Sequence, residues 1–134
     1  MNGDLSDSDY QALLAFRTRL RRFLRWSEQQ ARLVGLTGSQ HQLLLAIRGA
    51  GGDPTIGEVA EQLVTRHHSV VGLADRAEAA GLVERVRASS DHRVVRLRLT
   101  AEGSARLARL SALHREELAR LGSRLAPPWQ DPTG

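Results

Sequence analysis

Alternation of apolar and polar residues with a period of two, the mark of a β-strand, is confined to one stretch of this chain. The first half of that stretch, Val83 to Arg87, reads VERVR, and the second half, Val94 to Leu99, reads VVRLRL. Residues Ala88 to His92 between them form the tip of a turn. The sequence therefore predicts one short, arginine-rich β-hairpin in a chain whose remaining patterns are helical.

Elsewhere the apolar residues recur at spacings of three and four, which is the period of an amphipathic α-helix. Side chains that can accept a hydrogen bond from the first turn of a helix precede each such stretch, and they are Ser6, Thr37, Thr55, Thr65 and Thr100. Gly35 and Gly81 stand where two of the helices should end. The expected helices cover residues 8–33, 38–49, 56–63, 66–80 and 101–125.

A short helix, a tight turn and a second helix followed by a hairpin is the pattern of a winged helix-turn-helix. The expected fold class is therefore mainly α with a small β-hairpin, a winged helix-turn-helix flanked by long N- and C-terminal helices. With 134 residues the chain should form one domain, 1–134. Its winged helix would cover about 36–103 and its tail 127–134.

The composition excludes several chemistries. Cysteine is absent, which rules out disulfides, thiolate ligands and cysteine nucleophiles. All 19 basic residues are arginine, against 15 acidic residues, and this balance favours an anionic partner such as nucleic acid. There is no run of about 18 apolar residues, and the N-terminus is acidic. We therefore expect a cytoplasmic protein that does not enter a membrane.

The N-terminal end of the fourth helix carries side chains suited to reading DNA. In a helix-turn-helix protein, the second helix of the motif enters the major groove by this end. An arginine fork binds guanine, hydroxyl and imidazole groups hydrogen bond to bases, and a small apolar side chain contacts a thymine methyl. The residues expected to contact bases are Thr65, Arg66, His67, His68, Ser69 and Val70.

Arginines in and beside the hairpin should hold phosphates, and those expected to do so are Arg76, Arg87 and Arg96. At the hairpin tip, Arg93 has little to pack against, so we favour DNA contact there over a structural role. For Arg85 and Arg98 both roles stay open, because each could instead pair with Glu84 or another acid of the hairpin.

Four successive segments are similar to one known family. They are LTGSQHQLLLAIRG from Leu36, TIGEVAEQL from Thr55, TRHHSVVGLADRAEAAGLVERV from Thr65 and SSDHRVVRLRLTAEG from Ser89. In this order they resemble the multiple-antibiotic-resistance regulator (MarR) family over roughly half of the chain, from Leu36 to Gly103. The recognition-helix segment and the Asp-x-Arg wing followed by Leu-Thr are the most specific part of the match.

The resemblance implies a homodimer that binds a pseudo-palindromic DNA operator, usually as a repressor. It also implies release by a small aromatic or anionic effector in many members. The position that enters the minor groove in such proteins is Arg93 here, and Asp91 would brace it. Because cysteine is absent, the peroxide-sensing branch of the family does not apply.

Many members dimerise through an extra C-terminal helix, which the prolines at 127 and 128 leave no room for directly after the last helix. We therefore expect the first helix, 8–33, and the last, 101–125, to pair two chains. The interface residues expected are Leu13, Phe16, Leu107, Leu110, His114, Leu118, Leu121 and Leu125. An effector would bind between these helices and the DNA-binding lobe, near Phe16, Trp26, His41 and Leu45.

Histidines offer an alternative interpretation as metal ligands. Although His67 and His68 are adjacent, neighbours on a helix point about 100° apart, and no second ligand motif supports them. His41, His114 and Glu28 would have to converge in the fold. We therefore expect no metal and no cofactor. The arginine-rich first helix is expected to be a solvated face, with DNA or a ligand as its alternatives.

Three other functions compete with a sequence-specific regulator. An enzyme would need a nucleophile, a carboxylate pair or a metal at workable spacing, and the sequence shows none, so we expect no enzymatic activity. A nonspecific DNA-binding architectural protein and a protein-binding winged helix remain as alternatives.

Overall fold

The computed structural model describes residues 3–87 and 93–129. Within them the elements are α1 Asp7–Leu33, α2 Gly38–Gly49, α3 Ile56–Gln62, α4 His67–Ala79, β1 Val83–Arg87, β2 Val95–Leu99, α5 Ala101–Leu121 and the 3-10 helix η1 Gly122–Leu125. The two strands form an antiparallel sheet in which Val83 pairs with Leu99 and Arg87 with Val95. The predicted fold class, mainly helical with one small hairpin, is confirmed.

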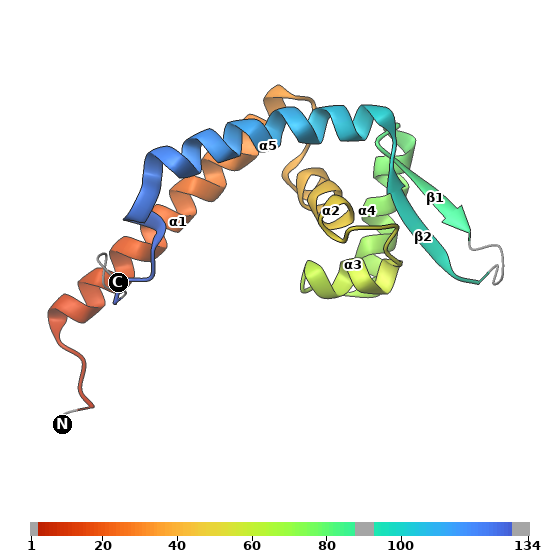
Figure 1. Ribbon diagram of the computed structural model, residues 1–134. Coiled ribbons are helices and arrows are strands. Elements are labelled where there is room, and N and C mark those ends of the chain that lie inside the picture. Colours follow the sequence, from red (N-terminus) through yellow and green to blue (C-terminus); the bar gives the residue numbers. More distant parts are fainter. Residues whose placement is uncertain (1–2, 88–92, 130–134) are drawn as a thin grey trace.

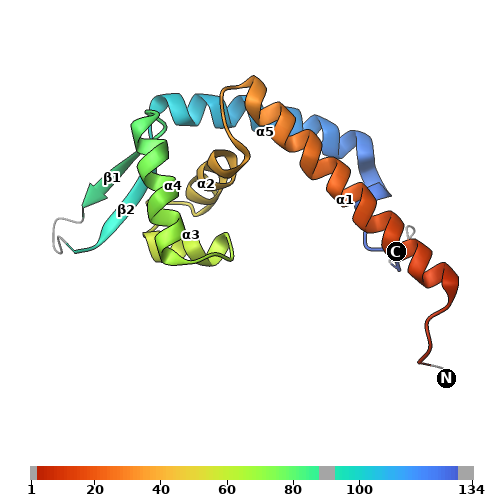
Figure 2. The ribbon, with the colours of Figure 1, turned by 180° about the vertical axis from the view of Figure 1, so that it is seen from behind.

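The molecule consists of a long arm and a compact lobe. Helices α1 and α5 lie side by side in the arm, and α2, α3, α4 and the hairpin form the lobe beneath one end of α5 (Figure 1; Figure 2 from behind). At the far end of the arm the chain after η1 returns to the start of α1, where Trp129 Nε1 donates to Asp9 Oδ1 at 3.3 Å. Within the described residues no helix is both long and apolar enough to cross a membrane.

Four of the five predicted N-caps are present. The side-chain oxygen accepts a hydrogen bond from the backbone N–H three residues later, over 3.3, 3.1, 3.1 and 3.1 Å, at Ser6, Thr37, Thr55 and Thr100. Asp9 and Gln40 return the bond and complete two capping boxes. Each cap is worth about 1 kcal/mol, and together they fix where the helices begin.

The prediction that Thr65 caps α4 is wrong. Helix α4 begins at His67, and its N-cap is Arg66, which makes no side-chain cap bond. The reason is the end of α3, where the Thr65 N–H donates to Ala60 O and the Val64 N–H to Glu61 O. These two bonds form a Schellman motif that includes Thr65 in the cap of α3 and moves the start of α4 one residue later.

The same motif ends α1 and α4 at the predicted glycines. Gly35 and Gly81 have φ of +78° and +75°, which favours glycine. The end of α5 differs from the prediction, because Gly122 adopts φ +53° and the helix stops at Leu121 instead of continuing to Leu125. The chain therefore turns before the prolines are reached.

One core joins the lobe to the arm. Leu43 and Leu44 of α2, Val70 of α4, Leu97 of β2 and Leu110 of α5 are all fully buried in it. Because these side chains come from four elements and pack against one another, the wing, α4 and the base of α5 are held in a fixed relation.

Candidate nucleic-acid interface

The N-terminal end of α4 presents polar side chains to solvent. Thr65, Arg66, His67 and His68 are exposed, and Ser69 is half-buried. The first turn of a helix also leaves backbone N–H groups without helical partners, which makes this end attractive to anions. Four of the six residues predicted to contact bases therefore lie on one exposed helix end.

The prediction that Val70 contacts a base is wrong. This side chain is fully buried, and it lies on the same face of α4 as the buried Ala74 and Ala77. Residues four and seven positions apart share one face of a helix, and here that face packs on the core. Val70 therefore holds the helix in place and is not available to DNA.

The arginines predicted to hold phosphates differ in their surroundings. Arg76 on α4, Arg87 at the end of β1 and Arg93 before β2 are exposed. The half-buried Arg96 donates from one guanidinium nitrogen to the backbone oxygen of Asp53 at 3.0 Å. The predicted bracing residue, Asp91, lies outside the described residues.

Arg85 joins the wing to α4. Its guanidinium donates to Asp75 Oδ1 at 2.6 Å and to Glu78 Oε1 at 2.9 Å, and the arginine side chain is only 23% exposed. The sequence left open a structural role through an acid of the hairpin, and the structure supplies that role through two acids of the preceding helix.

Arg98 joins the opposite face of the wing to the loop between α2 and α3. It donates to both carboxylate oxygens of Asp53, at 3.2 and 2.6 Å, and stands 3.9 Å from the predicted partner Glu84. The hydrogen bonds from Arg98 lower the pKa of Asp53 below its usual 3.8, so the carboxylate stays ionised at neutral pH. Asp53 was not among the residues singled out in the sequence.

A cavity of about 650 Å³ lies where the arm meets the lobe. Its lining comes from three helices and is mostly apolar, with Phe23 and Leu24 of α1, Leu45 of α2 and Leu118 of α5. Polar groups of the lining are Ser27, Glu28, His41, Gln42, Ser111, His114 and Arg115. Apolar walls with a few polar groups are typical of a site for a small organic ligand.

His114 connects the helices around this cavity. The backbone oxygen of Leu110 lies 2.8 Å from Nδ1, and Ser27 Oγ lies 2.6 Å from Nε2. A carbonyl only accepts, so the neutral ring carries its hydrogen on Nδ1 and accepts the Ser27 hydroxyl hydrogen at Nε2. The centroid of the His41 ring lies 5.0 Å from that of His114.

Two of the four residues predicted around an effector, His41 and Leu45, line the cavity. Trp26 stacks on Phe23 and meets the edge of His114 without lining the cavity, so the predicted role is not supported for it. Phe16 is also absent from the lining, because it precedes Ser27 by 11 positions, about 16 Å along α1. Among the described residues no three His, Asp or Glu side chains come together as metal ligands.

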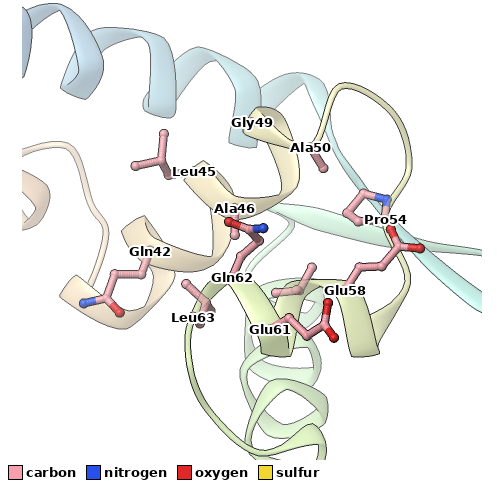
Figure 3. A pocket seen from close by; sticks show the side chains of 11 residues that line it. Gln42, Leu45, Ala46, Gly49, Ala50, Pro54, Glu58, Glu61, Gln62 and Leu63 are labelled. Atoms are coloured by element: carbon pink, nitrogen blue, oxygen red, sulfur yellow. The ribbon is translucent and has the colours of Figure 1, made fainter.

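A groove of about 570 Å³ lies between α2 and α3 (Figure 3). Gln42 and Leu45 border both this groove and the cavity, so the two are neighbours along α2. On the α3 side, Glu58, Glu61 and Gln62 stand at its rim and Leu63 contributes apolar surface.

The residues of α5 predicted to form a dimer interface differ in their burial. Leu107 and Leu110 are buried in the core of the chain itself, so the expectation that they contact a second copy is wrong. They pack in the same core cluster as residues of α2, α4 and β2, and α5 crosses above the lobe formed by these elements (Figure 1). Leu118 is 44% exposed, Leu121 and Leu125 are half-buried, and His114 lines the cavity. Leu13 and Phe16 on α1 are half-buried.

The geometry defines a winged helix-turn-helix protein: α3, a tight turn and α4, with a hairpin fixed to α4 by an ion pair. Residues 34–94 match the model of the MarR family. This match and the likeness to solved MarR family regulators confirm the resemblance expected from the sequence.

Solved structures share the fold of nearly the whole chain. A MarR family transcription regulator is 25% identical with a TM-score of 0.78, and the match covers 86% of this chain and 76% of that one. MOSR of M. tuberculosis, solved with DNA, is 26% identical with a TM-score of 0.63, covering 78% and 75%. A mutant of MarR from E. coli, solved with operator DNA, is 23% identical with a TM-score of 0.70, covering 88% and 84%. No curated protein matches the sequence.

Acidification should destabilise the fold through His41. Burial, and secondarily the nearby His114, lower the pKa of His41 below its usual 6.5. The unfolded chain therefore binds this proton more readily than the folded one, and the stability contributed above pH 6.5 is lost as the pH falls from 6.5 toward the folded pKa. Urea unfolding at about pH 7.5 and about pH 5.5 should show a smaller loss of free energy in His41→Gln than in the wild type.

The matched control is His67→Gln, which removes an exposed histidine from α4. It should keep the pH dependence of the wild type. If stability depends on pH equally in His41→Gln and the wild type, His41 is not the source of the loss of stability at acid pH.

Proposed function

We propose that this protein is a sequence-specific DNA-binding transcriptional regulator that acts as a homodimer on a pseudo-palindromic operator. The observation that carries the proposal is the exposed end of α4, Thr65 to His68, beside a wing that exposes Arg87 and Arg93 at the end away from α5. A helix end that offers arginine, imidazole and hydroxyl groups suits base recognition, and arginines of an adjacent hairpin suit phosphates or the minor groove.

The DNA contacts proposed are Thr65, Arg66, His67, His68 and Ser69 in the major groove, Arg93 in the minor groove, and Arg76, Arg87 and Arg96 on phosphates. MOSR, which has the same fold at 26% identity, was solved in complex with DNA, and this supports the proposal. A repressor that an effector releases is the form of regulation we propose. We propose that the protein has no enzymatic activity and that it acts in the cytoplasm.

A second copy of the chain is the proposed partner of the arm. On α1, Tyr10, Leu14 and Leu24 are between 53% and 64% exposed, and Leu118 of α5 adds to this surface. Several large apolar side chains exposed on one arm are typical of an interface between subunits. Two-fold pairing through the arms would place two α4 helices on the same side of the dimer, as a pseudo-palindrome requires.

The cavity at the junction of arm and lobe is the proposed effector site. His41, Gln42 and Arg115 can hydrogen bond to an acid group, while Phe23, Leu24 and Leu45 can contact an aromatic ring. A small aromatic acid is therefore the class of ligand that the lining favours.

Selection of binding sites from a random pool of duplexes tests the proposed function. Enrichment of one pseudo-palindromic sequence is the expected result. Equal, steeply salt-dependent binding to unrelated duplexes would indicate a nonspecific architectural protein. No binding to any duplex would leave a protein-binding winged helix as the function.

Arg66→Ala and Arg93→Ala should each weaken binding to the selected duplex by about 1 to 3 kcal/mol, because each removes a fork that contacts DNA. Fluorescence anisotropy over a salt series measures the affinities. Arg19→Ala removes the same charge from the exposed face of α1 and serves as the control. An equal loss of affinity in the control and in the two variants would mean that the effect comes from net charge alone.

Leu14→Glu should convert the dimer to a monomer. Two-fold symmetry buries the new carboxylate twice, so the dimer dissociation constant should rise roughly 100-fold or more. Sedimentation velocity at micromolar concentration gives the oligomeric state. Leu33→Glu alters a leucine at the opposite end of α1 that is 77% exposed, against 64% for Leu14, and it should remain dimeric. A wild type that is monomeric at these concentrations would reject the homodimer.

Some member of a panel of aromatic acids should raise the thermal midpoint of the wild type. At a ligand concentration of 100 times its Kd, the free energy of unfolding should increase by about 2.7 kcal/mol. Ser111→Glu places a negative charge in the lining of the cavity and should abolish the shift. Ser104→Glu adds the same charge elsewhere on α5 and should retain it. If no compound shifts the midpoint, the effector part of the proposal fails.

A further inference from the structure

The wing is attached to the lobe on both of its faces. Arg85 pairs with Leu97 across the sheet, so both lie on the face that packs toward the core. Glu84 pairs with Arg98, and both lie on the other face. On the core-side face Arg85 binds the acids of α4, as described above. On the other face, the side-chain hydrogen bonds of Arg96 and Arg98 go to one residue of the α2–α3 loop, Asp53.

Asp53 holds the outer strand of the wing at three points. Its carboxylate accepts both hydrogen bonds of Arg98, at 3.2 and 2.6 Å, and its backbone oxygen accepts one from Arg96 at 3.0 Å. The next residue, Pro54, accepts the backbone N–H of Leu97 at 2.8 Å. The segment that begins at Asp53 therefore lies along the free edge of β2, where Thr55 and Arg96 form an isolated antiparallel β-bridge.

Small movements at this attachment are amplified at the outer end of the two strands. Each strand has five residues, so Arg87 and Val95 stand about 13 Å from Val83 and Leu99 at the base of the wing. A rotation of about 6° at the base then moves the outer end by about 1.4 Å, which exceeds the tolerance of a hydrogen bond. Arg87 and Arg93 lie at that end.

We propose that Asp53 is a positioning residue for DNA recognition, which fixes the wing at the angle that brings its arginines and α4 onto the same duplex. The inference rests on the proposed function. Asp53 itself touches no DNA in this scheme and acts through Arg96 and Arg98.

Electrostatics makes the proposal sharply testable. Asp53 is negatively charged, so its direct effect on a polyanion is repulsive, and its removal by charge alone would strengthen DNA binding. A positioning role has the opposite sign, because a released wing no longer holds its arginines against the duplex. Glu84 offers a matched control, since it is an acid on the same face of the wing that stands 3.9 Å from Arg98.

The experiment compares wild type, Asp53→Asn and Glu84→Gln by anisotropy on the selected duplex over a salt series. Asp53→Asn should bind roughly 5- to 50-fold more weakly, and its salt slope should fall by about 0.9 for each phosphate that the wing no longer binds. Glu84→Gln should bind as tightly as the wild type or slightly more tightly. Since Asp53 and Arg98 are partly exposed, the thermal midpoint of Asp53→Asn should shift by no more than about 5 °C.

A second measurement needs no DNA. Hydrogen exchange of the Leu97 amide, which reports the bond to Pro54, should accelerate several-fold in Asp53→Asn and stay unchanged in Glu84→Gln. Asp53→Asn with the affinity, salt slope and Leu97 exchange of the wild type would overturn the inference while leaving the proposed function intact. Failure of the wild type to select any duplex would instead reject the proposed function, and the exchange rates would still test the attachment.

Discussion

The end of α4, the base of the wing and the start of α5 meet at one hydrogen-bonded junction. Leu82 O accepts the backbone N–H of Thr100 at 3.0 Å, and the Thr100 hydroxyl donates to Gly81 O at 2.6 Å while capping α5. Gly103 lies so close that a Cβ there would stand 2.1 Å from Leu82 O. Only glycine permits this approach, so the direction of the arm relative to α4 is fixed here.

From this junction the two halves of the molecule divide their tasks. The lobe orients α4 and the wing through buried side chains and two sets of ion pairs. Arg85 pairs with Asp75 and Glu78 of α4, and Arg98 pairs with Asp53 of the α2–α3 loop. The arm lies above a cavity in which Ser27, His41 and His114 bring α1, α2 and α5 together. A ligand in that cavity would contact the arm and α2 at once, and α2 leads directly into the loop that holds the wing. Helix α2 thus lies between the proposed effector site and the loop that holds the wing.

Much of the fold and part of the candidate site could be predicted from the chain. The hairpin and the course of α4 followed from periodicity and from the glycine at position 81, although the predicted cap of α4 was wrong. Val70, Leu107 and Leu110 were misassigned because an apolar stripe shows that a face is buried without showing what buries it. Asp53 was missed because nothing local marks an aspartate in a glycine-rich loop as the partner of an arginine 45 residues later.

The sequence by itself determined the elements and most of their ends, since capping bonds and glycine turns act between residues a few positions apart. It also determined the resemblance of residues 34–94 to the MarR family, which follows from the order of the segments there. Only the tertiary structure decided which polar side chains meet, such as Ser27 with His114, which are 87 residues apart. Such contacts depend on how whole helices pack, and packing is set by the sum of many side chains rather than by any short motif.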